Sequence, residues 1–364
     1  MHRGYASPAH NRRAAAAPSW CPTIEHGPDE RLYPANEIAL IVEALAAGGI
    51  APADALRNVG VPPDVLHSVR TRVSVNQVLQ CCRNAVRLSA DPFFAYHLGL
   101  RAHVATYGMY GFGILSSTSF REAFHFAIQY HALLTPIVPT GFREDAQHGI
   151  WSFQPIAHPA VDAPLYKFLV EFSFGVAVAI HRDIMGPHFV PEELRVVYQP
   201  SQDPRAYRDV FGCPFLFGQA ANELLFDAKW LNTAPSYGDR LAHATVVSVC
   251  DQFLQELQQQ TGTAGQVRRL VSANLARPGS LHSVARHLKM SPRTLRRKLH
   301  EEKTSLRKIV DEVRTYAALK HLRETTLTVE QVADRLGFSD EANFRRAFRR
   351  WTKGAPRDFR GARQ

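Results

Sequence analysis

Apolar residues recur at the helical period near the start of the chain. Four of them form one stripe ahead of Gly48-Gly49, where we expect the helix to end: Ile38, Ile41, Val42 and Leu45. The same spacing predicts helices over residues 73–88 and 120–134. In the second of these, Ser119 is a suitable N-cap and Pro136 follows the end. The first third of the chain is therefore expected to be mainly helical.

A strand-like pattern replaces the helical one further along. Residues 142–145 and 149–154 resemble the two strands of a hairpin, 194–199 a third strand and 223–226 a fourth. Between them, the apolar stretch 163–185 is long enough to be a buried helix. Helices first and a small mixed or antiparallel sheet later predict an α+β N-terminal domain.

The chain turns helical again after Asp239. Apolar residues at i, i+4, i+7 and i+11 form a stripe: Val246, Cys250, Phe253 and Leu257. The stretch that follows, 258–265, is polar and contains glycine, so we expect a linker there. The stripe could pack on its own domain or on a second subunit, and the sequence leaves both open.

These patterns divide the 364 residues into four parts. Residues 1–30 are rich in Pro, Ala, Arg and His without periodicity, which predicts a disordered tail. The α+β domain covers 31–235, and a helix with its linker covers 236–265. Residues 266–364 are expected to form an all-α C-terminal domain.

The C-terminal domain contains an internal near-repeat. Val284-Ala-Arg-His-Leu-Lys-Met-Ser291 aligns with Val332-Ala-Asp-Arg-Leu-Gly-Phe-Ser339. Each copy has the pattern of a short helix, a tight turn, a Ser cap and a second helix, which predicts two helix-turn-helix motifs. Gly337 suits the positive φ that such a turn needs, whereas Lys289 stands at the matching place in the first copy.

A long amphipathic helix is predicted between the two copies, over residues 305–323. Its apolar face is formed by Leu306, Val310, Val313 and Ala317. A helix of this length spans about 28 Å. It could hold the second helices of the two motifs about one DNA turn apart, roughly 34 Å, so that one protomer reads two neighbouring major-groove segments.

Positive charge is concentrated in the same domain. The chain carries a formal charge of +10, and residues 266–364 hold 24 Lys/Arg against 10 Asp/Glu. With Leu295, Leu299, Phe344 and Phe348 turned inward, the polar residues facing outward are Arg293, Arg296, Arg297, Lys298, Asn343, Arg345, Arg346, Arg349 and Arg350. Arginine can bond bidentately to guanine, and asparagine to adenine, in a major groove. A merely solvated cationic face is the alternative, and two such faces on capped repeats favour DNA binding.

The domain resembles the DNA-binding domain of the AraC/XylS family of bacterial transcription regulators, in the branch with an arabinose-binding-type N-terminal domain. The resemblance is carried by Met290-Ser-Pro-Arg-Thr-Leu-Arg-Arg-Lys-Leu299, by residues 336–352 and by Pro356-Arg-Asp-Phe-Arg360. It implies base contacts from Arg293, Arg296, Arg297, Glu341, Ala342 and Arg346. Thr294, Lys298, Asn343 and Arg345 complete the candidate DNA-binding set. Lys289, Lys303 and Lys353 stand where similar sequences commonly have glycine.

Three stretches, at 91–100, 107–113 and 119–123, also resemble the N-terminal domain of that branch. The resemblance covers about residues 35–235 and implies effector binding and dimerisation. We take as candidate ligand-binding residues Tyr107, Tyr110, Phe112, Phe124, Tyr130 and His131, which would suit an aromatic or amphiphilic effector. Core packing is the alternative for each. Arg101 could pair with an effector carboxylate or lie on the surface.

Other chemistry is not indicated. The five cysteines show no CxxC spacing, so we expect neither a disulfide framework nor a zinc site, and a reducing cytoplasm suits them. The histidines form no HxxxH pair, and no GxSxG motif occurs, while Ser116-Ser117 lacks an obvious base. The glycines of 108–113 indicate close helix packing rather than a dinucleotide loop. No signal peptide, membrane span or cofactor is expected.

The sequence thus predicts a cytoplasmic regulator that binds double-stranded DNA. We expect a homodimer whose small-molecule effector shifts the population of a DNA-competent state, and an activator, with RNA polymerase as a further partner. The alternative is a ligand-independent repressor or an architectural DNA-binding dimer. An N-terminal enzyme fused to a DNA-binding module is a third hypothesis, which no catalytic constellation supports.

Overall fold

The computed structural model describes residues 18–21, 27–259 and 262–360. The predicted disordered tail lies partly outside these ranges, at 1–17 and 22–26. Its described parts differ from the prediction, because Ser19–Trp20 (β1) pairs antiparallel with a strand of the main sheet. The Glu30 carboxylate also accepts a hydrogen bond from the Gly27 amide at 3.0 Å. Such long-range pairing is not visible in the local composition.

The N-terminal domain begins with short helices. They are α1 (Asn36–Ala47), α2 (Pro52–Ala55), α3 (Val75–Leu88), α4 (Phe94–Gly99), α5 (Gly108–Ser116) and α6 (Phe120–Tyr130), with 3-10 turns η1 (Pro63–Val65), η2 (Val104–Tyr107) and η3 (His131–Leu133). Ser119 caps α6 by accepting from the Glu122 amide, as predicted. The predicted helix 73–88 starts later, since Ser74 caps α3. Arg72–Val73 (β3) instead pairs with Tyr33–Pro34 (β2).

The main sheet has six strands in the order β1-β4-β5-β8-β6-β7. Its other strands are β4 (Thr140–Glu144), β5 (His148–Phe153), β6 (Glu193–Arg195), β7 (Phe215–Leu216) and β8 (Glu223–Asp227). All pairs are antiparallel except β6 with β7. The predicted third strand is short because the Val197 amide leaves the ladder and donates to the Asn222 side chain at 3.1 Å. The α+β prediction is confirmed.

Helix α7 (Ala163–Met185) lies in the core of this domain, as predicted. Asp162 caps it by accepting from the Leu165 amide. It is the one described helix long and apolar enough to cross a membrane, and 61% of its most apolar stretch is buried within the protein. Short elements α8 (Pro204–Phe211) and η4 (Ala228–Asn232) complete the domain.

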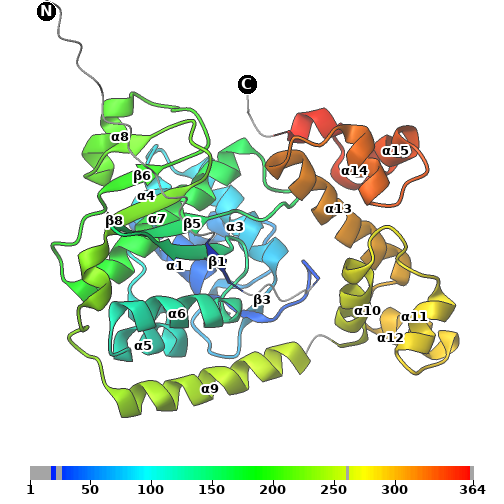
Figure 1. Ribbon diagram of the computed structural model, residues 1–364, viewed down its shortest axis with the longest axis horizontal. Coiled ribbons are helices and arrows are strands. Elements are labelled where there is room, and N and C mark those ends of the chain that lie inside the picture. Colours follow the sequence, from blue (N-terminus) through cyan, green and yellow to red (C-terminus); the bar gives the residue numbers. More distant parts are fainter. Residues whose placement is uncertain (1–17, 22–26, 260–261, 361–364) are drawn as a thin grey trace, which may run out of the picture.

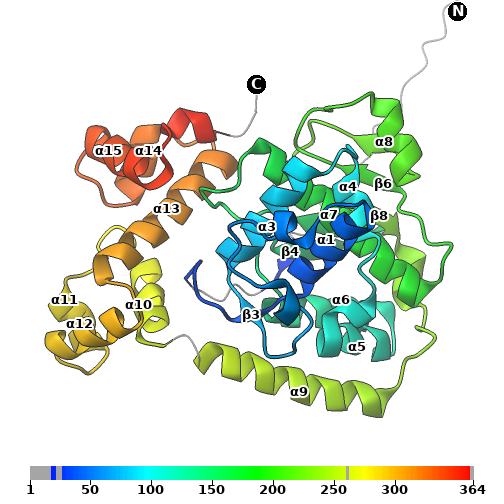
Figure 2. The ribbon, with the colours of Figure 1, turned by 180° about the vertical axis from the view of Figure 1, so that it is seen from behind.

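Helix α9 (Arg240–Gln259) runs along one edge of the N-terminal domain and leads to the C-terminal domain (Figures 1 and 2). Val246, Cys250 and Leu257 pack into the N-terminal core. Phe253, the fourth member of the predicted stripe, is 44% exposed and lies outside that core. The predicted linker is shorter than expected, because α10 (Gly262–Ala273) already begins at Gly262.

The C-terminal domain is helical, as predicted, and has two separate hydrophobic cores. Its remaining elements are α11 (Leu281–His287), α12 (Pro292–Glu301), α13 (Leu306–Glu324), α14 (Val329–Arg335), α15 (Glu341–Thr352) and η5 (Pro356–Phe359). Helix α13 runs between the two halves of this domain (Figure 2). It gives Ile309 to the first core and Leu319 and Leu322 to the second. These three side chains are its most buried large residues, whereas three residues of the predicted apolar face, Leu306, Val310 and Val313, are only partly buried.

Backbone with positive φ occurs where the resemblance indicated glycine. Lys289, Lys303 and Lys353 have φ of 55°, 54° and 63°, and Gly337 has 75°. The three lysines therefore keep the left-handed turn geometry at some conformational cost. A Cβ on Gly337 would lie 2.0 Å from the Ala276 carbonyl oxygen, so this turn also needs glycine for close packing.

Candidate nucleic-acid interface and ligand cavity

Helix α12 is the second helix of the first motif. Ser291 caps it by accepting from the Thr294 amide, and Pro292 occupies its first position, both as predicted. Leu295 and Leu299 are buried at 0% and 1% exposure. The polar residues between them consequently face away from the core.

Helix α15 is the corresponding helix of the second motif. Phe344 and Phe348 are fully buried and pack against each other with ring centroids 5.5 Å apart. The cap differs from the prediction: Asp340, not Ser339, accepts the hydrogen bond from the Asn343 amide. A carboxylate at this position also interacts favourably with the positive end of the helix dipole.

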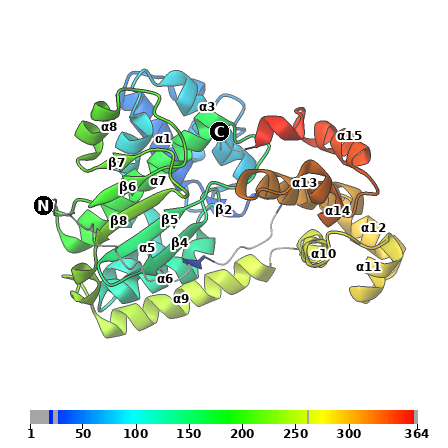
Figure 3. The same ribbon diagram turned by 45° about the horizontal axis from the view of Figure 1, so that its top comes forward.

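The candidate DNA-binding residues lie on the outer surfaces of these two helices. Exposed among them are Arg293, Arg296, Arg297, Ala342, Arg345 and Arg346; half-buried are Thr294, Lys298, Glu341 and Asn343. Arg349 and Arg350 are exposed on the same helix as Arg346. Both helices lie on the side of the C-terminal domain remote from the sheet (Figures 1 and 3).

Several of these side chains are held by neighbours. Arg345 forms an ion pair with Glu341 one turn away, and Arg346 donates to the Asn343 side chain at 2.6 Å. On α12, Arg297 pairs with Glu301. Exposed pairs of this kind contribute little to stability, so they can open to let the arginines reach DNA.

The N-terminal domain contains a cavity of about 130 Å³ between α7, the helices α5 and α6, and strand β5. Its wall is mainly apolar. The residues that line it are Glu37, Tyr107, Tyr110, Ile114, Phe124, Ala127, His131, Leu134, Thr135, Ile137, Val138, Thr140, Trp151, Phe153, Phe172, Ser173, Val176, Ala177, Ile180 and His181. Helix α7 contributes residues at i, i+3, i+4 and i+7 from Ser173, and this stripe is only half-buried.

Two histidines of the cavity wall are neutral. Trp151 donates to His181 Nε2 at 3.2 Å, and His181 Nδ1 lies 2.6 Å from the Ala177 carbonyl, so both ring nitrogens are engaged. His131 Nε2 lies 3.2 Å from the Thr140 hydroxyl oxygen. Burial lowers the pKa of each imidazole to about 4.

Glu37 is the acidic group of the cavity wall. Its side chain accepts a hydrogen bond from the Thr135 hydroxyl at 3.3 Å, and the residue is 9% exposed. Burial raises the pKa of this carboxyl to about 7. Glu37 is not among the residues predicted from the sequence, although its position in register with Ile41 and Leu45 of the apolar stripe was a usable signal.

Four of the six candidate ligand-binding residues line the cavity: Tyr107, Tyr110, Phe124 and His131. Tyr130 does not, because its hydroxyl points to α9 and donates to Asp251 at 2.7 Å. Phe112 is 46% exposed, since it stands on the opposite face of α5 from Tyr110. Arg101 is exposed as well and does not line the cavity. The structure therefore places these three residues elsewhere.

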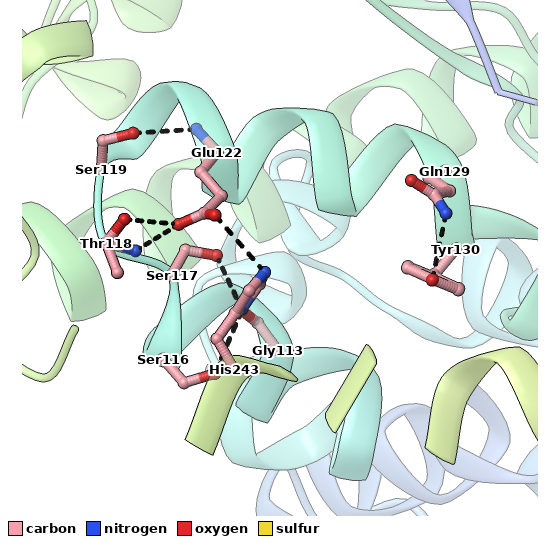
Figure 4. A network of polar contacts seen from close by, with 9 residues as sticks. All are labelled: Gly113, Ser116, Ser117, Thr118, Ser119, Glu122, Gln129, Tyr130 and His243. Atoms are coloured by element: carbon pink, nitrogen blue, oxygen red, sulfur yellow. Dashed lines mark hydrogen bonds and ion pairs between the residues drawn. The ribbon is translucent and has the colours of Figure 1, made fainter. Parts of the chain in front are cut away.

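A Ser-His-Glu cluster joins α5 and α6 to α9 (Figure 4). His243 Nδ1 lies 3.4 Å from Ser117 Oγ and 3.5 Å from Ser116 Oγ, and Nε2 lies 3.9 Å from Glu122. The sequence shows no obvious base for these serines because His243 is over 120 residues away. His243 Nδ1 also lies 3.1 Å from the Gly113 carbonyl and must donate to it. It therefore cannot accept a serine proton, and the cluster is a structural connection.

No metal site accompanies these groups. Among the described residues, no cluster of three or more His, Cys, Asp or Glu side chains could hold an ion. All five cysteines are buried and unpaired with one another.

The two domains touch through the segment that joins β5 to α7. Arg323 of α13 donates to the Val161 carbonyl at 2.7 Å and to the Ile156 carbonyl at 3.5 Å. The His158 ring packs edge-on against Tyr316 of the same helix, with centroids 5.6 Å apart. Because β5 and α7 both line the cavity, this segment connects the cavity wall directly to the C-terminal domain.

A second contact between the domains is ionic. The guanidinium of Arg268 on α10 is 7% exposed and lies between Glu30 and Glu312. The Glu312 oxygen is 3.1 Å away. A buried cation with two carboxylate partners holds the start of the N-terminal domain against α10 and α13.

Family models match both parts of the chain. Residues 49–234 match the arabinose-binding domain of AraC transcription regulator, N-terminal, and residues 284–362 match a helix-turn-helix domain. The first segment contains every residue that lines the cavity except Glu37, and the second contains α12 and α15.

Two relatives match nearly the whole chain. The ornithine utilization regulator of Pseudomonas aeruginosa is 30% identical over 342 residues, covering 91% of this chain and 97% of the relative. A helix-turn-helix-type transcriptional regulator of Mycobacterium tuberculosis is 26% identical over 337 residues, again covering 91% and 97%. Among solved structures, the regulator CdpR from Pseudomonas aeruginosa is 24% identical, covering 89% of this chain and 98% of that one, with a TM-score of 0.48.

Proposed function

Since the chain belongs to the AraC/XylS family and is a DNA-binding transcription regulator rather than an enzyme, we propose that it reads two adjacent major-groove segments with α12 and α15. One observation carries the proposal: two capped helices, each buried on its apolar face, present exposed arginines on the other. Helix α13, about 28 Å long, holds them a fixed distance apart.

Base readout is assigned to Arg293, Arg296 and Arg297 on α12 and to Glu341, Ala342 and Arg346 on α15. Among the described residues, Arg293 and Arg296 make no ion pair or hydrogen bond, so they are free to meet base edges. Thr294, Lys298, Asn343 and Arg345 are placed beside them and would contact the sugar-phosphate backbone or complete base contacts.

The test is a selection from random duplexes followed by binding isotherms at several salt concentrations. Arg296→Ala and Arg346→Ala should each lose about 1–3 kcal/mol at one particular base pair. The exposed Arg277, outside both motifs, supplies the control Arg277→Ala, which should leave specificity unchanged. Equal weakening of all sequences would make the residue a phosphate contact and would count against direct readout.

The N-terminal cavity is proposed as the effector site, with Tyr107, Tyr110, Phe124 and His131 in contact with the ligand. An effector that fits one arrangement of β5 and α7 better than another shifts the population of that arrangement. The segment held by Arg323 then passes the change to α13 and the two recognition helices. Titration of full-length protein with candidate metabolites, reading thermal stability and DNA affinity together, tests this step.

We further propose a cytoplasmic homodimer that activates transcription through contact with RNA polymerase. Helix α9 supports dimerisation, because its Leu241 and Phe253 are 79% and 44% exposed. Sedimentation of Leu241→Asp against the unaltered chain tests the dimer. Transcription in vitro separates activation from the alternative, a ligand-independent repressor.

A further inference from the structure

The cavity of the N-terminal domain has no cationic side chain in its wall. None of the lining residues, all within the described part of the chain, is Lys or Arg, and both histidines are neutral. A ligand carboxylate there would lie near Glu37 without a counter-charge, which is unfavourable in a buried site. The wall therefore disfavours fatty acids and zwitterionic amino acids.

The same wall disfavours sugars, although the matching family model is described as arabinose-binding. A sugar needs a hydrogen-bond partner for each hydroxyl that it buries. Many of the polar groups here are engaged with protein partners, since Ser173 donates to the Leu169 carbonyl at 2.8 Å, Tyr110 donates to the Ala127 carbonyl at 3.2 Å and His181 is satisfied on both nitrogens. Most of the remaining wall is aromatic or aliphatic.

The size of the cavity points to a small molecule. Its volume of about 130 Å³ is close to that of an engineered apolar cavity, about 150 Å³, that accepts benzene. Six aromatic rings surround the space: Tyr107, Tyr110, Phe124, Trp151, Phe153 and Phe172. A single ring could pack edge-on or offset against several of them.

Resting on the proposed effector role, we propose that the ligand is a ring-sized, mainly apolar molecule that carries one hydroxyl or amino donor and no carboxylate. The donor is directed at the Glu37 carboxyl, the acidic acceptor of the wall, and the ring lies among the aromatic side chains. Thr135 already donates to Glu37 Oε2 and fixes the orientation of the carboxyl.

The test uses the full-length protein and five compounds at equal concentration: benzyl alcohol, benzylamine, toluene, benzoate and arabinose. Thermal unfolding and tryptophan fluorescence report binding, since Trp151 lines the cavity. Benzyl alcohol or benzylamine should bind at least about tenfold more tightly than toluene, because the donor pairs with a buried carboxyl. Benzoate and arabinose should give no shift. The proposal is overturned if benzoate or arabinose binds more tightly than benzyl alcohol and benzylamine, or if neither of these two donor compounds binds.

Variants of Glu37 test whether the donor group of the ligand binds at this carboxyl. Glu37→Leu should weaken the donor compounds by about tenfold or more and leave toluene unchanged. Glu37→Gln keeps an acceptor, so it should retain benzyl alcohol and lose benzylamine. Glu43, on the exposed side of α1, supplies the control Glu43→Leu, which should change nothing. Equal binding of the donor compounds to the Glu37→Leu variant and the unaltered chain contradicts the proposal.

A variant that fills the cavity tests the proposed ligand site even if the Glu37 variants do not fold. The side chain introduced by Ala177→Leu projects from the half-buried stripe of α7 into the cavity. It should weaken the binding of benzyl alcohol, benzylamine and toluene by at least about tenfold. Unchanged binding would place the compounds elsewhere and refute the proposal. Selection of DNA sequences without ligand is carried out in parallel. If the protein prefers particular DNA sequences but the compounds do not bind as expected, only the proposed ligand class is refuted. If the protein shows no preference for any DNA sequence, the proposed function itself is refuted.

Discussion

The turn of the second motif offers a quantitative test of the backbone geometry. Gly337 has a φ of +75°, and a Cβ there would lie 2.0 Å from the Ala276 carbonyl oxygen. In Gly337→Ala the left-handed conformation costs about 1–2 kcal/mol. Relieving the overlap requires a backbone shift that adds about 1–3 kcal/mol. We expect a total loss of about 2–5 kcal/mol in local stability.

Two companion variants separate these contributions. Gly212 has nearly the same φ, +73°, but open space around its Cβ position, so Gly212→Ala should cost only the conformational part, about 1–2 kcal/mol. Lys289 occupies the equivalent turn of the first motif with φ of +55° and is exposed. Lys289→Gly should therefore stabilise its motif by about 0.5–1 kcal/mol.

Amide hydrogen exchange of the full-length protein measures each effect in its own segment. Exchange in α14 and α15 should accelerate by about 30- to 5000-fold in Gly337→Ala, and exchange in α11 and α12 should slow in Lys289→Gly. DNA affinity should fall with the first variant, because α15 loses its fixed position. Unchanged exchange in α15 of Gly337→Ala would refute the close approach of Ala276 to the turn.

Further predictions concern pH, the domain contact and salt. The pKa values of Glu37 and Glu171, both raised to about 7, mean that the folded state holds extra protons above the unfolded pKa of these groups. Their stabilising contribution is present at low pH and is lost between about pH 4.5 and 7. His131, His158 and His181 have pKa values lowered to about 4, so their contribution to stability instead rises between about pH 4 and 6.5. The urea midpoint of unfolding should therefore be highest near pH 6.5. A midpoint that still rises from pH 7 to 8 would contradict these assignments. Arg323→Ala should speed amide exchange at 156–161 and reduce any effector-induced change in DNA affinity, whereas Lys320→Ala, on the exposed side of α13, should do neither. Specific DNA affinity should fall steeply as salt rises, through counterion release; a flat salt dependence would argue against phosphate contacts by the arginine-rich helices.

The recognition helices could be predicted because the signals for them are local. Ser291, Pro292, Leu295 and Leu299 lie within nine residues, and spacing alone fixes which face is buried. The cap of α15 shows the limit of local signals, because the sequence predicts Ser339 and the structure has Asp340. Either of these adjacent residues could accept a hydrogen bond from the same backbone amide. Deciding between them takes the turn geometry.

The cavity was predicted only in part because its wall is assembled from distant segments. Tyr110 and Phe112 are two residues apart on a helix, so aromatic content alone could not tell the cavity face from the solvent face. His243 meets Ser117 across a gap of 126 residues, and β1 pairs with β4 over a similar distance. Contacts of this range depend on the whole topology, and no local period encodes them.

The length of helix α13 sets both the distance between the two helix-turn-helix motifs and their relative rotation. Each residue added near Arg314, between the two cores, would rotate one motif by about 100° relative to the other and displace it by about 1.5 Å. Seven added residues restore the angle to within about 20° and lengthen the rod by about 10.5 Å, or roughly three base pairs. Such a chain should bind its operator more weakly, because three base pairs also turn the major groove by about 100°, a rotation that seven residues do not supply. Insertions of one or two residues change the angle between the motifs with almost no displacement, so they should weaken binding as well.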